Sequence, residues 1–166
     1  MPVGNEISVS SYQNFDGSNT TLALYSKNYK PTKNLSLTGG VGGSTGFNGT
    51  NSFVLEGKAK YNLNKHVNFQ ARLRNSFSSQ KNVSQLRLSG GYKTDIANNT
   101  SIYVTPYAAA KYNYRDNSIA TDIGAFAGVT QNLSPNLSVS AEVQKYNDFK
   151  PGSENWGMNA ILSYTF

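Results

Sequence analysis

The sequence predicts an all-β protein, a closed, antiparallel, up-and-down transmembrane β-barrel of about ten strands. Three observations carry this expectation. Only 14% of the residues are charged and 37% are hydrophobic, yet the chain holds 11 Tyr and 8 Phe. Apolar and polar residues alternate along its segments, and the last segment alternates up to a terminal aromatic residue, Phe166. Such a strand needs neighbours on both sides and an apolar surround, which a barrel in a membrane supplies.

Composition narrows the class further. The mean hydropathy is −0.49, and no run approaches the length of apolar sequence that a transmembrane helix needs. Disorder would explain the polar content but not the regularly spaced aromatic residues. A barrel explains both, because half of each strand faces lipid and half faces a polar lumen. At 166 residues, with no linker, the chain is expected to be one domain over 1–166.

Turn residues divide the chain into alternating segments of roughly ten residues. We expect strands over 5–14, 18–29, 34–45, 51–63, 66–78, 82–95, 100–114, 118–131, 136–147 and 154–166. A helical period fits none of them.

The last four segments show their two faces most clearly. The side chains predicted to face lipid include Ile102, Val104, Ala108 and Ala110 in 100–114, Ile119, Ile123, Ala127 and Val129 in 118–131, Leu137, Val139, Ala141 and Val143 in 136–147, and Trp156, Met158, Leu162 and Tyr164 in 154–166. Pro106 also falls on this face, and because proline cannot donate to a strand ladder, a bulge or kink is expected there.

The connections form two alternating sets. The compact polar turns are Thr32 to Asn34, Asn64 to His66, Ile96 to Asn99 and Ser134 to Asn136. The other set is on average longer and richer in Gly and Asp: Asp16-Gly17, Gly46 to Gly49, Ser78 to Asn82, Asp116-Asn117 and Asn147 to Glu154. An even strand number places both termini at the end with the compact turns. Aromatic girdles are expected from Tyr29, Tyr61, Tyr92, Tyr164 and Phe166 at that end, and from Phe53, Phe77, Tyr112 and Tyr114 at the other.

Two strand–turn–strand units and the C-terminus resemble a known group. The units 61–69 and 131–139 are similar to those of small Gram-negative outer-membrane β-barrel proteins, and Tyr164-Thr165-Phe166 resembles the C-terminal signal for insertion of such barrels. Ile161 stands where a Gly often precedes the final aromatics. The resemblance covers the whole chain at superfamily level. It implies a bacterial outer-membrane location with both termini periplasmic, and as partners the bilayer with its lipopolysaccharide and the outer-membrane assembly machinery.

The residues opposite the apolar faces would line the lumen. Eight are basic (Lys27, Lys58, Lys60, Arg72, Arg74, Arg87, Lys93 and Lys111) and four are acidic (Glu6, Glu56, Asp122 and Glu142). An inward position is expected because a basic residue on the lipid face costs about 2–4 kcal/mol at the midplane. The predicted polar network, or possible pore lining, is Glu56, Lys58, Arg72, Arg74, Arg87, Lys111, Asp122, Glu142 and Asn159. Hairpin geometry predicts the neighbours Glu56–Arg74, Arg74–Arg87, Lys111–Asp122 and Glu142–Asn159.

The sequence is compatible with three functions. The leading one is a structural or surface membrane protein whose polar lumen is largely filled by a salt-bridge network. The first alternative is a narrow, porin-like channel for small, preferably anionic solutes, favoured by the basic excess. The second alternative is adhesion through the outer loops, with Phe47, Phe149 and Trp156 as anchors.

Catalytic, cofactor and metal sites are not predicted. The chain has no Cys, and its one histidine, His66, lies in a predicted turn without an orienting carboxylate or hydroxyl. Asp16, Asp116, Asp148 and Glu154 lie on separate loops, where acidic residues usually serve solubility. The net charge of +6 comes from scattered Lys and Arg, which argues against nucleic-acid binding. A non-enzymatic protein is therefore expected.

Overall fold

The computed structural model describes residues 2–14, 19–46, 51–79, 82–147, 149, 152 and 154–166. Ten strands follow one another: β1 (Pro2–Asn14), β2 (Asn19–Tyr29), β3 (Leu35–Gly46), β4 (Asn51–Asn62), β5 (Val67–Phe77), β6 (Asn82–Ala97), β7 (Thr100–Asn113), β8 (Ser118–Asn132), β9 (Leu137–Tyr146) and β10 (Asn155–Thr165). Apart from the start of β1 and the end of β6, every boundary lies within one residue of its predicted position.

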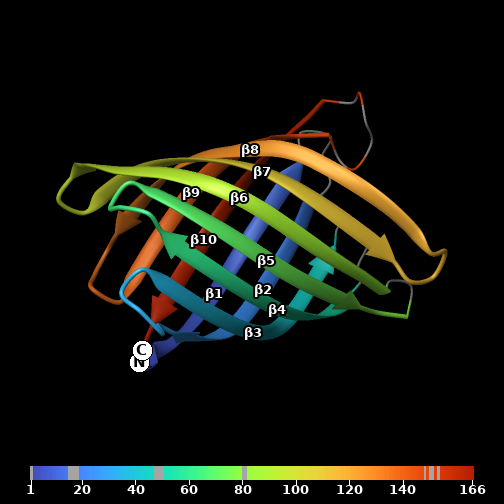
Figure 1. Cartoon of the computed structure of the whole chain (residues 1–166), viewed down its shortest axis with the longest axis horizontal. Helices are drawn as coiled ribbons and strands as arrows, with labels where there is room; N and C mark the ends of the chain where they lie inside the picture. The colour runs from blue at the N-terminus through green and yellow to red at the C-terminus, as the bar shows by residue number, and fades with distance from the viewer. Residues whose placement is uncertain are drawn as a thin grey trace.

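The strands close into a single antiparallel barrel (Figure 1). Each strand pairs with the next along the chain, and β1 pairs with β10. Backbone hydrogen bonds from the Asn5 amide to the Phe166 carbonyl (3.0 Å) and back (2.9 Å) extend this closing pair to the last residue. The predicted fold class is confirmed. No described segment forms a helix of the length and apolarity that crossing a bilayer would require.

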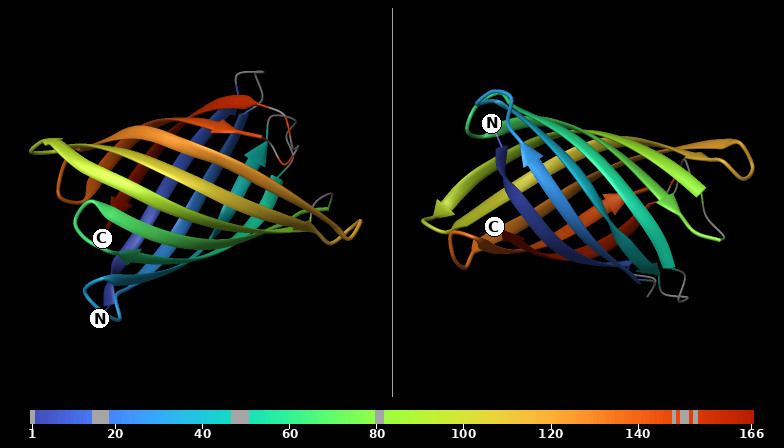
Figure 2. Two further views of the ribbon diagram at one scale, coloured as in Figure 1. Left: turned by 45° about the horizontal axis from the view of Figure 1, so that its top comes forward. Right: turned by 90° about the horizontal axis from the view of Figure 1, so that it is seen from below.

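Both chain ends lie at the same end of the barrel as the connections 30–34, 63–66, 98–99 and 133–136 (Figures 1 and 2). We call this the turn end, and the opposite end, where β1 ends and β2 begins, the loop end. All strands tilt against the barrel axis in each of the three views, as closure of a sheet into a barrel demands.

Three of the four turns at the turn end share one local hydrogen-bond pattern. Thr32, Asn64 and Ser134 each accept, at a side-chain oxygen, the backbone amides two and three residues further on. Asn, Ser and Thr make such turns because their short side chains satisfy amides that the strands leave free. At the loop end, Asp116 accepts the hydroxyl and amide of Ser118, and these bonds lower the pKa of Asp116.

Inside the barrel, polar and charged side chains lie beside hydrophobic ones, whereas the outer face is largely apolar. Among the described residues, six hydrophobic side chains are buried, and six polar or charged ones are buried with them, including Glu56, Arg72 and Asp122. Outward positions carry exposed apolar side chains, such as Leu88 at 56% and Ile123 at 68%. This arrangement reverses that of a water-soluble domain and is typical of a barrel surrounded by lipid.

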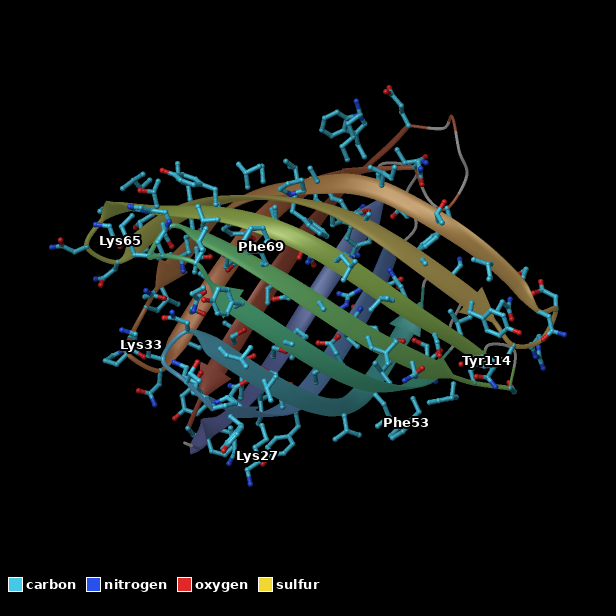
Figure 3. All side chains as sticks on the ribbon, viewed as in Figure 1. Lys27, Lys33, Phe53, Lys65, Phe69 and Tyr114 are labelled. Atoms are coloured by element: carbon cyan, nitrogen blue, oxygen red, sulfur yellow. The ribbon has the colours of Figure 1, made fainter. Side chains whose placement is uncertain are left out.

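Exposed aromatic residues lie near both ends. Tyr29, Tyr61, Tyr92, Tyr164 and Phe166 are exposed at the turn end, and Phe53, Phe77 and Tyr114 at the loop end. Figure 3 shows Phe53 directed away from the barrel. Tyr112 is half-buried because its ring packs edge-on against Tyr114, with 4.7 Å between the centroids. The two predicted girdles are therefore present on the outer surface.

The bulge expected at Pro106 is absent. Pro106 lies opposite Ala125 in an unbroken β7–β8 register. On its other side the β6–β7 register is the same before and after it, and shifts only between Asp95 and Ala97. The expected bulge does not form because one missing donor interrupts a ladder locally without requiring an extra residue in the strand, and the kink stays a prediction.

Candidate functional site: the barrel lumen

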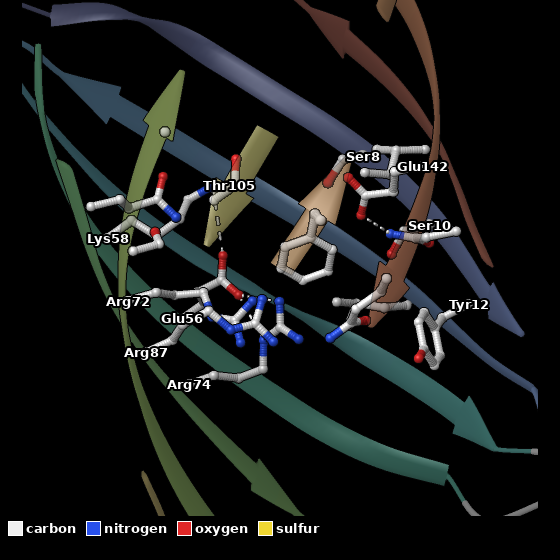
Figure 4. Close-up of a pocket in the computed structure, with 18 of the residues that line it drawn as sticks. Ser8, Ser10, Tyr12, Glu56, Lys58, Arg72, Arg74, Arg87, Thr105 and Glu142 are labelled. Carbon is white, nitrogen blue, oxygen red and sulfur yellow. Dashed lines mark hydrogen bonds and ion pairs between the residues drawn. The ribbon is translucent and has the colours of Figure 1, made fainter. Parts of the chain in front are cut away.

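A cavity of about 660 Å³ lies inside the barrel. Its lining reaches from Glu6 and Lys93 near the turn end to Thr20 and Phe149 near the loop end. Figure 4 shows its central part. Alternation along each strand brings every second side chain to the lumen, so the lining is mostly polar.

Strands β4, β5 and β6 form a basic wall. Glu56 is the one carboxylate that the described residues of these strands direct into the cavity, and it is only 9% exposed. Arg74 donates from Nε to Glu56 Oε2 at 2.7 Å, and its Nη2 lies 2.5 Å from the same oxygen. Lys58 Nζ lies 3.8 Å from the other oxygen. Glu56 therefore forms its closest ion pair with Arg74 and a longer, weaker one with Lys58.

Arg72 and Arg87 lie opposite each other on β5 and β6. Arg72 is 8% exposed, and the Nε atoms of both residues are buried without a hydrogen-bond partner. The guanidinium carbon of Arg87 lies 4.4 Å from the ring centroid of Tyr107 and 4.9 Å from that of Phe126. These aromatic faces attract the cation and fix its position. In Figure 4 the guanidinium groups of Arg72, Arg74 and Arg87 gather in the middle of the lumen, beside Glu56.

The opposite wall holds Glu142 among neutral partners. Tyr103 donates its hydroxyl to Glu142 Oε2 at 2.5 Å, and Asn159 donates its amide to Oε1 at 2.9 Å. Tyr103 reaches from β7 across β8 to β9 because Gly128 lies between them, paired with Tyr103 on one side and with Glu142 on the other. A Cβ on Gly128 would lie 2.7 Å from the Tyr103 ring.

Asp122 belongs to a second network nearer the loop end. The hydroxyl of Tyr107, a residue only 4% exposed, donates to Asp122 Oδ2 at 2.9 Å and accepts the Gln144 amide at 2.6 Å. The Asn147 backbone amide donates to Asp122 Oδ1 at 2.9 Å. Gly124 on β8 leaves room for the Tyr107 ring, as Gly128 does for Tyr103. Both carboxylates of this wall are therefore held by neutral hydrogen-bond donors.

Aromatic side chains narrow the lumen at the loop end. The loop-end aromatic cluster consists of Tyr12, Tyr107, Phe126, Tyr146 and Phe149. The rings of Tyr107 and Phe126 stack with their centroids 5.1 Å apart, and Tyr12 meets Tyr146 edge-on at 6.2 Å. Lys111 Nζ lies 4.2 Å from the centroid of the Phe149 ring.

The turn end opens into a basic vestibule. A cavity of about 400 Å³ there is lined by Asn34, Lys60, Asn62, Asn64, Lys65, His66, Asn68 and Lys93. None of these eight described residues is acidic. His66 Nδ1 lies 3.0 Å from the Lys93 carbonyl oxygen, so the histidine is a turn residue bonded to the backbone. We call this cavity the lysine vestibule.

The structure brings most of the predicted lumen residues together. The main cavity is lined by Glu56, Lys58, Arg72, Arg74, Arg87, Asp122, Glu142 and Asn159. Lys111 is half-buried beside Phe149 at the loop end. The expected neighbours Glu56–Arg74 and Glu142–Asn159 are opposite each other. Whether these residues serve as a pore lining stays a prediction.

Two expected neighbours are diagonal rather than directly opposite. Arg87 lies opposite Arg72, and Arg74 lies opposite Gln85, so Arg74 and Arg87 lie near each other without facing each other directly. Among the described residues, Lys111 and Asp122 form no ion pair, since their partners across β7–β8 are Ala120 and Ala109.

The prediction placed Lys27 on the wrong face of its strand. It is exposed on the outer face of β2 (Figure 3), paired with Asn5 and Gly39. Leu22 and Leu24 take the inward positions of that strand. Seven of the eight basic residues thus remain inward candidates.

Sequence reasoning missed the aromatic part of the lumen. Tyr103 and Tyr107 stood on the polar face of their segment, where a period of two already directs them inward. Phe126 shares the inward parity of Asp122 on β8, so the same alternation could have found it. An aromatic residue in a polar lumen contradicts the simple pattern of polar inside and apolar outside.

Other candidate sites remain weak. The described part of the chain holds no group of three or more His, Cys, Asp or Glu side chains that could bind a metal ion. Of the four loop acids, Asp116 is bonded to Ser118 and Glu154 forms an exposed pair with Lys145 at 3.2 Å. Asp16 and Asp148 lie outside the described residues.

No model of a known protein family matches the chain, and no curated protein is similar to it in sequence. Solved structures do resemble it. The KdgM porin superimposes with a TM-score of 0.59 at 14% identity, covering 97% of this chain and 99% of that one. The NanC porin gives 0.54 at 12% identity, covering 96% and 100%. The N-terminal β-barrel domain of Pseudomonas aeruginosa OprF gives a TM-score of 0.53 at 13% identity, covering 100% of each chain.

These likenesses span nearly the whole of each chain. At such low identities they establish the architecture and nothing finer. The chain has the fold of the bacterial outer-membrane β-barrel proteins.

Proposed function

We propose that this protein resides in the bacterial outer membrane and that its lumen is a narrow, porin-like channel for small, preferably anionic solutes. One observation carries the proposal: a single cavity of about 660 Å³ is bordered by residues from both ends of the barrel. A lumen closed along its length by side chains would instead divide into separate small voids.

The charges that line the cavity support anions as the preferred solutes. Six lining residues are basic (Lys58, Lys60, Arg72, Arg74, Arg87 and Lys93) and four are acidic (Glu6, Glu56, Asp122 and Glu142). Excess Lys and Arg in a pore lowers the barrier for anions and raises it for cations. One solved structure of the KdgM porin is a complex with disordered oligogalacturonate, a carboxylate-bearing sugar. Small carboxylates are therefore the first solutes to test on this chain.

Orientation and partners form part of the same proposal. Both termini and the lysine vestibule would face the periplasm, and the loop end would face the lipopolysaccharide leaflet. Tyr164 and Phe166, whose rings stack at 6.0 Å on the outer face, would be read by the outer-membrane assembly machinery. The protein would have no catalytic role.

Planar-bilayer recording tests the channel. The refolded protein should give discrete conductance steps, and a KCl gradient should produce a reversal potential of the sign that indicates anion preference. Arg72→Ala combined with Arg74→Ala should move the reversal potential toward zero, because the central positive charge is lost. Arg115→Ala, at the loop-end rim, should leave it nearly unchanged. Silent bilayers at high salt would eliminate the channel.

A filled structural barrel is the second candidate. The loop-end aromatic cluster and the Tyr107–Asp122–Gln144 network favour it, because their side chains occupy the lumen between Arg87 and the loop end. In that case a well-folded preparation gives no conductance steps, and truncation of Phe149 to Ala does not create any. Conductance that appears only in Phe149→Ala would place the closure at that ring.

Adhesion through the loops stays a prediction. Phe47 lies outside the described residues, while Trp156 faces outward on β10 and Phe149 packs into the loop-end aromatic cluster. Replacing residues 147–154 with Gly and Ser and measuring cell binding would test it.

A further inference from the structure

Arg72 and Arg87, the arginine pair, form no direct ion pair with a described carboxylate, and Glu56, Asp122 and Glu142 act on them only at longer range. No hydrogen bond or ion pair from another described residue reaches Arg72, and Arg87 contacts only the faces of Tyr107 and Phe126 within the described contacts. Arg72 is more than nine-tenths buried. Burying a charge without a partner is costly, so this pair needs a negative group that the protein itself does not supply.

The carboxylates near the arginine pair already accept hydrogen bonds from other residues. Glu56 receives both close contacts from Arg74 and a longer one from Lys58. Glu142 is bonded by Tyr103 and Asn159. Since each carboxylate has its own donors, none can turn toward the arginine pair without breaking a short hydrogen bond.

The geometry of the arginine pair suits an oxyanion. Directly opposite residues on antiparallel strands have Cβ atoms about 4.5–5.5 Å apart, so their side chains enter the lumen together. Arg87 is held in place by two aromatic faces, which leaves its N–H edge free for a ligand. Planar guanidinium groups bind two oxygens of one group at once, which a spherical ion cannot match.

We propose that the arginine pair binds one oxyanion group, a carboxylate, phosphate or sulfate, in the middle of the lumen. The guanidinium groups of Arg72 and Arg87, which line the cavity, supply the donors, and the cavity beside them supplies the space. The site goes beyond the proposed channel, because a bound anion can serve as a structural counter-ion whether or not the lumen conducts.

Calorimetric titration of the refolded barrel in uncharged detergent tests the site. Inorganic phosphate at constant ionic strength should bind saturably with one ion per barrel, and chloride should bind at least about tenfold more weakly, since it lacks paired oxygens. Arg72→Gln and Arg87→Gln should each weaken phosphate binding by about tenfold or more. Arg115→Gln, at the rim, should not change it.

A variant with the opposite expected sign guards against misfolding as an explanation. Glu56→Gln removes the charge that neutralises Arg74, so it should tighten phosphate binding by about twofold or more. A damaged barrel would not gain affinity. Arg87→Lys keeps the charge but loses the planar guanidinium group, so the affinity for phosphate should fall toward the affinity for chloride.

The nature of the oxyanion follows from parallel titrations with acetate, sulfate and phosphate. Preference for any one of them over chloride supports the site and names its ligand. Equal binding of chloride and all three oxyanions, or phosphate affinity that Arg72→Gln leaves unchanged, would overturn it. Phosphate binding without conductance would refute the proposed channel but support the oxyanion site. Conductance without saturable phosphate binding would support the channel but refute the site.

Discussion

Glu56 and Glu142 are the same residue type in the same lumen, yet their partners differ in charge. Glu56 accepts hydrogen bonds from a guanidinium, so its charge is cancelled locally. Glu142 accepts from a phenol and an amide, so its negative charge persists in the lumen. At the scale of single residues, the electrostatic field inside the barrel therefore depends on whether the donors to each carboxylate are charged or neutral.

Removing Glu56 should destabilise the barrel more than removing an exposed acid. Glu56→Ala leaves Arg74 without its ion pair and should lower the free energy of unfolding by about 1–3 kcal/mol. Guanidinium unfolding in detergent, followed by fluorescence of the single Trp156, measures it. Glu154→Ala is the matched control, because its pair with Lys145 is exposed and should be worth about 0–1 kcal/mol. Equal losses in both variants would contradict the expectation.

Tyr107 links Asp122 to Gln144 through one hydroxyl. Tyr107→Phe keeps the ring under Arg87 but removes the hydroxyl partner of Asp122 Oδ2 and of the Gln144 amide, which should cost about 1–3 kcal/mol of unfolding free energy. Tyr112→Phe loses only a bond to Asn117 in an exposed turn, so its effect should stay within about 0.5 kcal/mol. The same unfolding measurement compares them, and a Tyr107→Phe protein as stable as the parent would show that the network is dispensable.

At the scale of strands, alternation together with turn residues predicted where the elements begin and end, apart from the start of β1 and the end of β6. It succeeded where one face is clearly apolar, as in β9 with Leu137 and Val139 outward. It failed for Lys27 because Leu22 and Leu24 are inward while Tyr25 is outward, so both faces of β2 contain apolar residues. Alternation with a period of two residues cannot show which face of a strand points inward when both faces contain apolar residues.

Contacts across hairpins were harder to predict than the strands themselves. Arg87 lies directly opposite Arg72 and only diagonal to Arg74, because the register of β5–β6 depends on the hairpin connection, which alternation along a strand does not define. The reach of Tyr103 to Glu142 spans two strand pairs and rests on Gly128. Such contacts follow from barrel curvature, which no local pattern encodes.

Gly128 should resist substitution. A Cβ there would lie 2.7 Å from the Ala141 carbonyl oxygen and from the Tyr103 ring, so Gly128→Ala should cost about 1–3 kcal/mol and displace Tyr103 from Glu142. Gly39 on β3 is the control, because a Cβ there meets nothing within 4 Å. Gly39→Ala should change the unfolding free energy by no more than about 0.5 kcal/mol. Similar losses at the two positions would refute the argument from close approach.

For the whole molecule, the apolar outer face decides how the protein folds. Side chains such as Leu88 and Ile123 are exposed over the middle of the barrel, and water offers them no partner. The ring can therefore be stable only where lipid or detergent covers this face.

Refolding should require an amphiphile. After dilution from denaturant into detergent, the protein should form a heat-resistant species that migrates differently on SDS gels until it is boiled. Dilution into buffer alone should give aggregates. A monodisperse folded monomer in plain buffer would contradict the membrane assignment.

The lysine vestibule makes the two mouths of the lumen electrically unlike. Lys60, Lys65 and Lys93 line one side of the turn end, where Glu6 is the acidic cavity residue, whereas Asp122 lies near the loop end with Lys111. If the lumen conducts, anions concentrate at one mouth before entry and not at the other. The barrel should then act as a rectifier, with unequal currents at equal voltages of opposite sign, and Lys60→Gln with Lys93→Gln should straighten the current–voltage curve.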